Sequence, residues 1–461
     1  MPRNTRTPSL SKPSTLPIPV STIVGMPPLL RRKRRGSELG PRGQRARRRR
    51  PRHPADSAAV QPQPAIPRSF WIYVASRLCA ATAMTLLRAA IAWHVYDLTK
   101  SAFFLGLVGL VQFVPVLSLT LVGGAVADAY DRRRIMRAAQ LPIVACGALL
   151  CFAAARGDVA LPVPFAAVFV ISACFAFDSP ARQALLPTLV PLASFPRAVT
   201  LASSAQALAF AAGPALGGLA IAQGGVETAY GLHALLVTLN WIGLAFVRPI
   251  RDAHERRAPS WQAVREGIAF VRRSPVILGC MTLDMFAVIF GGATALLPIY
   301  ATEILSVGPR GYGLLSASLE IGALTSALVM TIRRPVSRAG PALLGAVAVY
   351  GVATIAFGFS RAFPLSVAAY MVAGMADQVS VVMRQTAIQL ATPDALRGRV
   401  SAVNMIAIAA SNQLGAVESG FVAAATSPTF AVVSGGVGCL VVLAIVAWRV
   451  PELRRYRHAH A

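Results

Sequence analysis

Charged side chains within long apolar segments are the residues of this sequence best placed to do chemistry. Six of them interrupt apolar runs of about 20 residues, a length that can cross a bilayer: Arg77, Arg88, Asp284, Glu320, Asp377 and Glu418. A charge at membrane depth costs at least about 2.5 kcal/mol, so such residues are usually paired or functional. Four acids against two arginines leave carboxylates without a partner, and an unpaired buried carboxylate tends to take up a proton. The six residues are therefore candidate sites for protons or for a transported molecule.

The positions of these charges along their segments suggest which of them could pair. Arg77 and Arg88 are eleven residues apart, about three helical turns, and so point the same way. Arg77 lies at about the depth of Asp284, and Arg88 at about the depth of Glu418. Both pairings are hypotheses, because equal depth does not establish contact.

Glu320 is the first candidate for the proton or cargo site. It lies about ten residues into its segment, nearest the expected midplane, and has no arginine at its depth. Asp377 precedes Arg384 by seven residues on the same helix face, and we expect it to be structural.

The elements that must position these charges are membrane-spanning helices. The sequence is 55% hydrophobic and 14% charged, whereas soluble proteins carry about 25% charged residues. We therefore predict an all-α integral membrane protein of twelve transmembrane helices, arranged as two six-helix halves around a central cavity. The predicted spans are 70–97, 103–126, 135–155, 161–177, 198–222, 229–247, 276–301, 311–332, 341–360, 363–383, 400–425 and 429–448.

The loop charges predict the orientation of these spans. Five loops on one side carry 19 arginines, whereas the six loops on the other side carry four basic residues. By the positive-inside rule the first set, and both termini, are cytoplasmic. We expect a multi-pass protein of the bacterial inner membrane, with both ends of the chain in the cytoplasm.

The predicted domains follow from the spans and the polar stretches between them. Residues 249–275 form the longest inter-span loop, and Val264, Ile268 and Val271 lie there at helical spacing, which predicts an amphipathic helix on the membrane surface. The predicted order is a disordered cytoplasmic tail at 1–68, a first half at 69–248, this linker at 249–275, a second half at 276–450 and a C-terminal tail at 451–461.

The N-terminal tail carries sixteen Lys and Arg residues but only two acids, and it lacks the apolar content to fold. Three interpretations remain open: a disordered or mis-assigned extension, a hold on anionic lipid, and, least favoured, a nucleic-acid arm. We expect no nucleic-acid partner.

An internal repeat relates the two halves. At an offset of 202 residues, Arg182-Gln183 matches Arg384-Gln385, and the same offset pairs Gly213 with Gly415 and Gly218 with Gly420. Six spans in each half make this a parallel repeat, for which a site near the membrane midplane between the halves is expected.

Several motifs resemble the major facilitator superfamily. Gly124-Ala-Val-Ala-Asp-Ala-Tyr-Asp-Arg-Arg-Arg134 looks like its signature loop between spans 2 and 3, although Asp131 stands where glycine is commonest. The stretches 180–187, 393–400 and 414–420 resemble the branch that includes enterobactin exporters and related efflux permeases. The resemblance covers about 69–450 and implies export of chemically diverse cargo.

The resemblance implies a cytoplasmic latch that holds one side of the transporter closed, although a basic loop that merely fixes topology remains the alternative. In this interpretation Gly124 allows close helix approach, Asp128 meets a helix N-terminus, and Arg132 pairs with Asp178. The latch candidates are Gly124, Asp128, Arg132, Arg133, Asp178, Arg182, Arg384 and Arg397.

Gly213-Pro214-Ala-Leu-Gly217-Gly218 looks like the Gly-Pro motif of drug–proton antiporters. These residues suit either a helix hinge or simple close packing between helices.

The function expected from these features is proton-driven efflux of a drug-like or siderophore-like small molecule. An uptake symporter or uniporter of the same fold, and a receptor that has lost transport, are the alternatives. The sequence has no phosphate-binding Gly-x4-Gly-Lys-Ser/Thr loop and no Cys-x-x-Cys pair. We expect no enzyme activity, no cofactor and no metal, and a monomer in the lipid bilayer.

Overall fold

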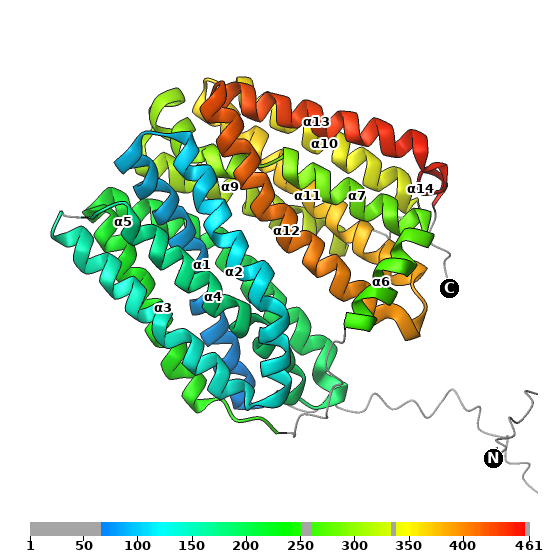
Figure 1. Cartoon of the computed structure of the whole chain (residues 1–461), viewed down its shortest axis with the longest axis horizontal. Helices are drawn as coiled ribbons and strands as arrows, with labels where there is room; N and C mark the ends of the chain where they lie inside the picture. The colour runs from blue at the N-terminus through cyan, green and yellow to red at the C-terminus, as the bar shows by residue number, and fades with distance from the viewer. Residues whose placement is uncertain (1–65, 158, 251–260, 333–337, 457–461) are drawn as a thin grey trace, which may run out of the picture. The chain divides into compact units, whose positions relative to one another are not determined.

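The chain folds into helices throughout the part that its structure, a computed structural model, describes: residues 66–157, 159–250, 261–332 and 338–456. These residues fall within one compact unit, Pro62–Ala461 (Figure 1). Most of the predicted N-terminal tail, the middle of the linker and the side chain of Asp128 lie outside what is described.

The first half contains five helices that account for six predicted spans. They are α1 (Arg68–Thr99), α2 (Ala102–Ala129), α3 (Arg132–Ala155), α4 (Pro162–Leu185) and α5 (Phe195–Phe246). The last helix is long because it joins two spans across Gly224 and Gly225, whose backbone angles are not helical. Gly225 has φ +76°, a conformation that residues with a Cβ adopt at a cost. Eleven helices in the described chain are long and apolar enough to cross a membrane, and the joined pair brings the spans to twelve.

The second half begins with the linker helix α6 (Trp261–Arg273) and continues with α7 (Pro275–Phe290). Its seventh span is broken after Phe290. Beyond Gly291 and Gly292 it continues as short segments, η4 (Ala293–Leu296), α8 (Leu297–Ile299) and the π-helical η5 (Tyr300–Ile304). The remaining helices are α9 (Gly308–Ile332), α10 (Ala339–Phe359), α11 (Phe363–Ala391), α12 (Arg397–Ala425), α13 (Pro428–Arg449) and the short α14 (Pro451–Arg455).

Apolar side chains both fill the interior and cover the outside of the bundle. Large hydrophobic residues such as Leu328, Val352 and Trp448 are more than half exposed. Exposed apolar surface on this scale would aggregate in water but suits contact with lipid.

The predicted repeat is visible in the backbone. The 3-10 turn η3 (Leu192–Ser194) precedes α5, and η6 (Asp394–Leu396) precedes α12. Both turns and both helix starts are related by the offset of 202 residues found in the sequence. The duplication therefore extends from single residue identities to local structure.

Two helix pairs make the main contacts between the halves, α5 with α9 and α2 with α12; the second pair lies side by side in Figure 1. A Cβ on Gly218 would lie 2.5 Å from the Cα of Gly313, and a Cβ on Gly420 would collide with Gly106. Because Gly218 and Gly420 occupy equivalent positions in the repeat, the two glycine crossings are counterparts of each other.

The glycine crossings lie toward the end of the bundle that contains loops 100–101, 305–307 and 426–427, here termed the closed end. The hydroxyl of Tyr312 donates to the carbonyl of Ala89 over 3.0 Å, and the hydroxyl of Tyr96 donates to Glu303. Ring contacts of Trp93 with Tyr312 and of Phe103 with Phe421 join the halves at this end as well. The halves are thus held together toward one end.

Substituting Gly218 with alanine should disturb this arrangement. The added methyl group meets backbone atoms of α9, which cannot move aside as a flexible side chain would, and overpacking of this kind costs about 1–3 kcal/mol. We expect a lower melting temperature in detergent and a longer distance between spin labels at Lys100 and Ser306, on opposite halves of the closed end.

Gly345→Ala in α10 is the matched control, because a Cβ there meets no atom within 4 Å. It should leave the label distance unchanged and, by favouring helix, should not lower stability. If the two variants behave alike, the crossing does not hold the halves together.

Candidate functional site

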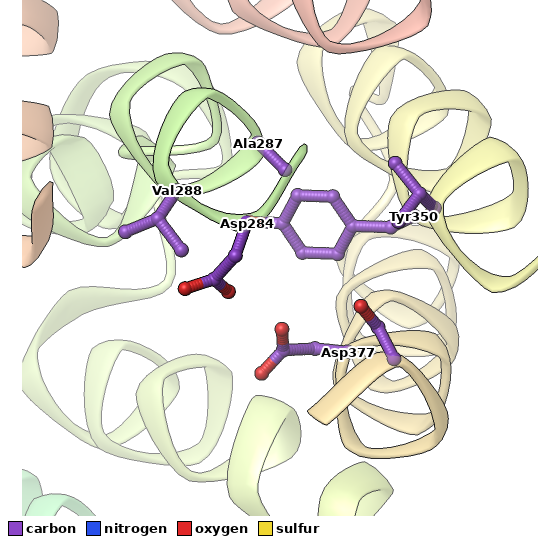
Figure 2. Close-up of a pocket in the computed structure, with 7 residues that line it drawn as sticks. Asp284, Ala287, Val288, Tyr350 and Asp377 are labelled. Carbon is purple, nitrogen blue, oxygen red and sulfur yellow. The ribbon is translucent and has the colours of Figure 1, made fainter. Parts of the chain in front are cut away.

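A pocket inside the second half brings together two of the predicted carboxylates. Asp284 of α7 and Asp377 of α11 face each other across it, and Tyr350 of α10 forms part of the wall (Figure 2). Ser380 and the apolar residues Ala287, Val288 and Val347 complete the lining. Helix α7 and the consecutive helices α10 and α11 therefore place acidic, aromatic and apolar groups around one space.

Arg384 neutralises one of these carboxylates. It follows Asp377 by two helical turns on the same side of α11, and it forms an ion pair with Asp284 of α7. The side chains of Arg384 and Asp284 are 3% and 10% exposed, so water screens the pair little. The predicted pairing of Asp284 with Arg77 is wrong, as is the placement of Arg384 in a cytoplasmic loop.

Asp377 is the carboxylate left over. Its side chain is partly buried, and no hydrogen bond or ion pair to it occurs among the described residues. Its carboxylate lies within electrostatic reach of Glu320 on α9 and of the phenol of Tyr370. No described contact therefore supports the prediction that Asp377 has a structural role.

Glu320 has an arginine near it, contrary to the sequence-based expectation. Arg88 of α1, in the other half, lies within electrostatic reach of its carboxylate. Arg88 was expected to pair with Glu418, but the described contact of Glu418 is with the hydroxyl of Ser419, at 3.2 Å. The central charges therefore connect the two halves through Arg88 and Glu320.

Arg88 also lines a second pocket, within the first half. Gln112 of α2 and Ser172 of α4 are its polar neighbours there, among apolar side chains: Met84, Leu87, Ile91, Val168 and Ile171. The side chain of Arg88 is exposed, although α1 packs against α5 and α9. Arg77, by contrast, is held within its own half, where it donates to Gln206 and, over 3.3 Å, to the hydroxyl of Tyr73.

Two tyrosines fix the break in the seventh span beside the pocket. The hydroxyl of Tyr350 donates to the carbonyl of Gly291 over 3.1 Å, and the hydroxyls of Tyr370 and Thr294 lie 2.6 Å apart. Broken helices in transporters commonly line binding sites, and their free backbone groups are tolerated where they are buried in protein or line a water-filled cavity. Neither the break nor these tyrosines was predicted; the only local signal is the pair Gly291-Gly292.

The predicted latch residues fall into separate contacts. Asp178 is 2% exposed and accepts hydrogen bonds from Arg182, at 2.7 and 2.9 Å, and from Gln140, at 3.1 Å. The expected partner of Asp178, Arg132, is therefore replaced by Arg182, four residues along the same helix. Helices α2 and α4 cross closely at Gly123, which lies against the backbone of Ala176. The sequence analysis assigned this close approach to the neighbouring Gly124.

Two other latch arginines bind within their own halves. Arg133 donates to the carbonyl of Val247 over 2.9 Å, while Asp131 caps α3 by accepting from the backbone N–H of Arg133. Arg397 pairs with Asp394, and both side chains are more than half exposed.

The Gly-Pro motif of α5 makes three close helix contacts. Gly213 lies against Thr85 and Gly217 against Leu86 of α1, whereas Gly218 lies against α9. Pro214 is inside the helix, and the interruption of α5 occurs later, at Gly224 and Gly225. These contacts favour packing as the role of the motif.

Comparisons with known proteins agree with this architecture. Residues 63–459 match the sequence profile of the family described as "Transmembrane secretion effector", a branch of the major facilitator superfamily. The chain belongs to this family. It is 25% identical over 393 residues to enterobactin exporters EntS of Shigella boydii serotype 4 and Escherichia coli O139:H28, covering 83% of this chain and 92% of each relative.

Solved transporter structures share the fold. The peptide transporter POT in complex with sulfate superposes with a TM-score of 0.67 at 13% identity, covering 86% of this chain and 98% of that one. The human organic anion transporter MFSD10 superposes with a TM-score of 0.60 at 14% identity, covering 83% of this chain and 100% of that one. The family member described here is therefore a multi-pass transporter of the major facilitator fold.

The ion pair between Asp284 and Arg384 should be essential to the stability of the second half. Removing one partner of a buried pair leaves the other charge unpaired and costs about 3–5 kcal/mol, so we expect Arg384→Gln to lower the melting temperature strongly. Asp284→Asn combined with Arg384→Gln should recover part of the loss. The measurement is a double-mutant cycle of thermal unfolding in detergent.

Arg397→Gln serves as the control, since its pair with Asp394 is largely exposed and such pairs contribute about 0–1 kcal/mol. Equal effects of the Arg384 and Arg397 substitutions would contradict the structural role assigned to the buried pair.

Proposed function

We propose that the chain exports a small molecule in exchange for protons, by alternating access to a site between its two halves. The observation that supports proton coupling is a charge imbalance. Three carboxylates, of Asp284, Glu320 and Asp377, lie within electrostatic reach of two guanidinium groups, of Arg88 and Arg384, or of one another. With all five ionised, the cluster carries one uncompensated negative charge.

One additional positive charge would neutralise the cluster. An uncompensated charge at membrane depth is costly, and neighbouring carboxylates that cannot both ionise share a proton. Glu320 and Asp377, which interact electrostatically, are the pair on which we place that proton. If the cluster must be neutral for the transporter to change conformation, the transporter can do so only with a proton or with cargo bound. This condition couples the exit of cargo to the entry of protons.

The glycine crossings provide the geometry for alternating access. Motion about the α5–α9 and α2–α12 contacts would separate the halves at the closed end and bring them together at the arginine-rich end. Parallel-repeat transporters move in this way, with the substrate bound near the midplane. Arg88 and Glu320, on facing halves, lie where such a motion changes their separation.

The orientation we propose places the arginine-rich end in the cytoplasm of a bacterium, with the transporter in its inner membrane. Both termini then lie in the cytoplasm, and the closed end faces the outside of the inner membrane. Export is supported by the enterobactin exporters among the relatives, with a siderophore-like or drug-like cargo and a monomeric transporter as the working proposal.

The function can be tested by first finding the cargo and then measuring its transport. A strain that lacks the gene and a strain that overproduces the protein are compared for drug susceptibility and for secreted metabolites. Everted membrane vesicles with an acidic interior should then accumulate the identified compound, and a protonophore should abolish the accumulation. Accumulation that needs no proton gradient, or only in vesicles of the opposite orientation, would contradict proton-driven export.

Asp377→Asn and Glu320→Gln should each abolish transport driven by the proton gradient. Either change removes the uncompensated negative charge, so the cluster is neutral without a proton. In proteoliposomes we expect loss of accumulation driven by a pH gradient, at least tenfold. Asp97→Asn is the control, because that carboxylate is exposed and paired with Lys100 at the closed end. Accumulation at the wild-type level in both cluster variants would remove them from the coupling mechanism.

Reporter fusions test the orientation. Alkaline phosphatase is active only outside the cytoplasm, so a fusion after Ser306, at the closed end, should be active, and one after Tyr456 should be inactive. A green fluorescent protein at the same two positions should give the reverse pattern. Activity of the phosphatase after Tyr456 would invert the proposed topology.

A further inference from the structure

Building on proton exchange as the proposed function, we propose that the pocket between Asp284, Tyr350 and Asp377 binds a positively charged head group of the cargo, an organic ammonium. The cargo would then be a monovalent organic cation with an apolar body. The chemistry of the pocket wall and its charge support this assignment.

The two carboxylates of the pocket are the first support. Asp284 and Asp377 approach from different helices and face each other across the space (Figure 2). Arg384 compensates Asp284, whose side chain is nine-tenths buried, and its guanidinium is itself buried and fixed by that pair. Asp377 has no such partner among the described residues, so the pocket presents one carboxylate whose charge is free to attract a cation.

The aromatic wall favours an organic cation over an inorganic one. Tyr350 has its hydroxyl committed to the carbonyl of Gly291, which holds the ring in place beside the carboxylates. A ring face attracts an ammonium group that has shed its water. Ala287, Val288 and Val347 add apolar contacts that suit the carbon atoms next to the nitrogen. A small inorganic cation takes oxygen ligands only, so the aromatic ring and the apolar residues of this wall would contribute nothing to its binding.

Among the described residues, the surroundings add no further positive charge to Asp377. Across from it lie Asp284 on α7, Glu320 on α9 and the phenols of Tyr350 and Tyr370. The nearest guanidinium groups are those of Arg384 and Arg88. Their charges are already compensated by Asp284 and Glu320, respectively. A proton and an ammonium group would each supply the one missing charge, so the two should exclude one another.

This exclusion has a direct consequence for transport. If cargo and proton cannot occupy the cluster together, the transporter crosses the membrane with one or the other. A monovalent cation leaves as one proton enters, and the exchange moves no net charge. Such an exchange would respond to the pH difference across the membrane and little to its voltage.

Proton release on ligand binding tests the inference without the need for transport. The purified full-length protein in detergent, in weakly buffered solution with a pH indicator, receives benzylammonium chloride, benzyl alcohol or sodium chloride. Benzyl alcohol matches the shape of benzylammonium but is uncharged. We expect benzylammonium to release up to one proton per molecule of protein, and the other two additions to release none.

Variants of the pocket identify the residues responsible. Asp377→Asn should abolish proton release, Asp377→Glu should restore it, and Asp97→Asn at the closed end should match the wild type. Tyr350→Leu should weaken benzylammonium binding about tenfold, whereas Tyr350→Phe, which keeps the ring, should change it less. Thermal unfolding of each variant shows whether it is folded, and the Asp377→Glu protein separates loss of the site from loss of structure.

The inference is overturned if benzylammonium releases no proton from the wild type, if sodium chloride releases as much, or if Asp377→Asn releases as much. These outcomes are distinct from failure of the proposed function. A compound that accumulates in everted vesicles under a proton gradient, while benzylammonium releases no proton, would retain proton-driven export and reject the cationic cargo. Proton release by benzylammonium without proton-driven accumulation would retain the cation site and reject proton-driven export.

Discussion

The close approach of four glycines is the constraint on which the arrangement of the two halves depends. At Gly218 with Gly313, and at Gly106 with Gly420, the helix backbones are so near that even a methyl group would collide. Only glycine permits this distance, and dispersion contacts between backbones replace the side-chain contacts that are lost. Because the crossings lie toward one end, the hydrogen bonds and ring contacts described between the halves gather there as well, and the interior charges lie beyond them.

The duplicated scaffold has been used differently in its two halves. Arg182 and Arg384 are equivalent in the repeat, but Arg182 pairs within its own helix with Asp178, whereas position 380, the counterpart of 178, is a serine. Arg384 finds its partner on α7 instead. The replacement of an acid by Ser380 thus leaves a polar pocket in the second half where the first half has a closed ion pair.

Much of the fold could be predicted from the sequence, because hydropathy reports directly on the membrane. The number of spans, the all-helical architecture and the repeat follow from apolar runs and a constant offset, and the family profile and solved transporters confirm the class. The joining of two spans across Gly224 and Gly225 and the break at Gly291 were not predicted. Backbone conformation at glycine depends on tertiary packing that hydropathy does not record.

The pairing of the interior charges was harder to predict, for a geometric reason. Position along a span gives depth, but contact also requires that two helices be neighbours and that their faces meet. Depth alone paired Arg88 with Glu418, yet α1 packs against α9, and Arg88 lies near Glu320. The same limitation hid Arg384, which charge counting assigned to a loop although it lies inside α11.

The linker between the halves has a consequence for how they can move. Glu266 of α6 pairs with Arg399 of α12, and Gly267 lies against the backbone of the same residue, so α6 belongs mechanically to the second half. The chain between Ile250 and Trp261 is then the only covalent tether that must follow any displacement. A displacement of one half against the other would therefore carry α6 along with the second half.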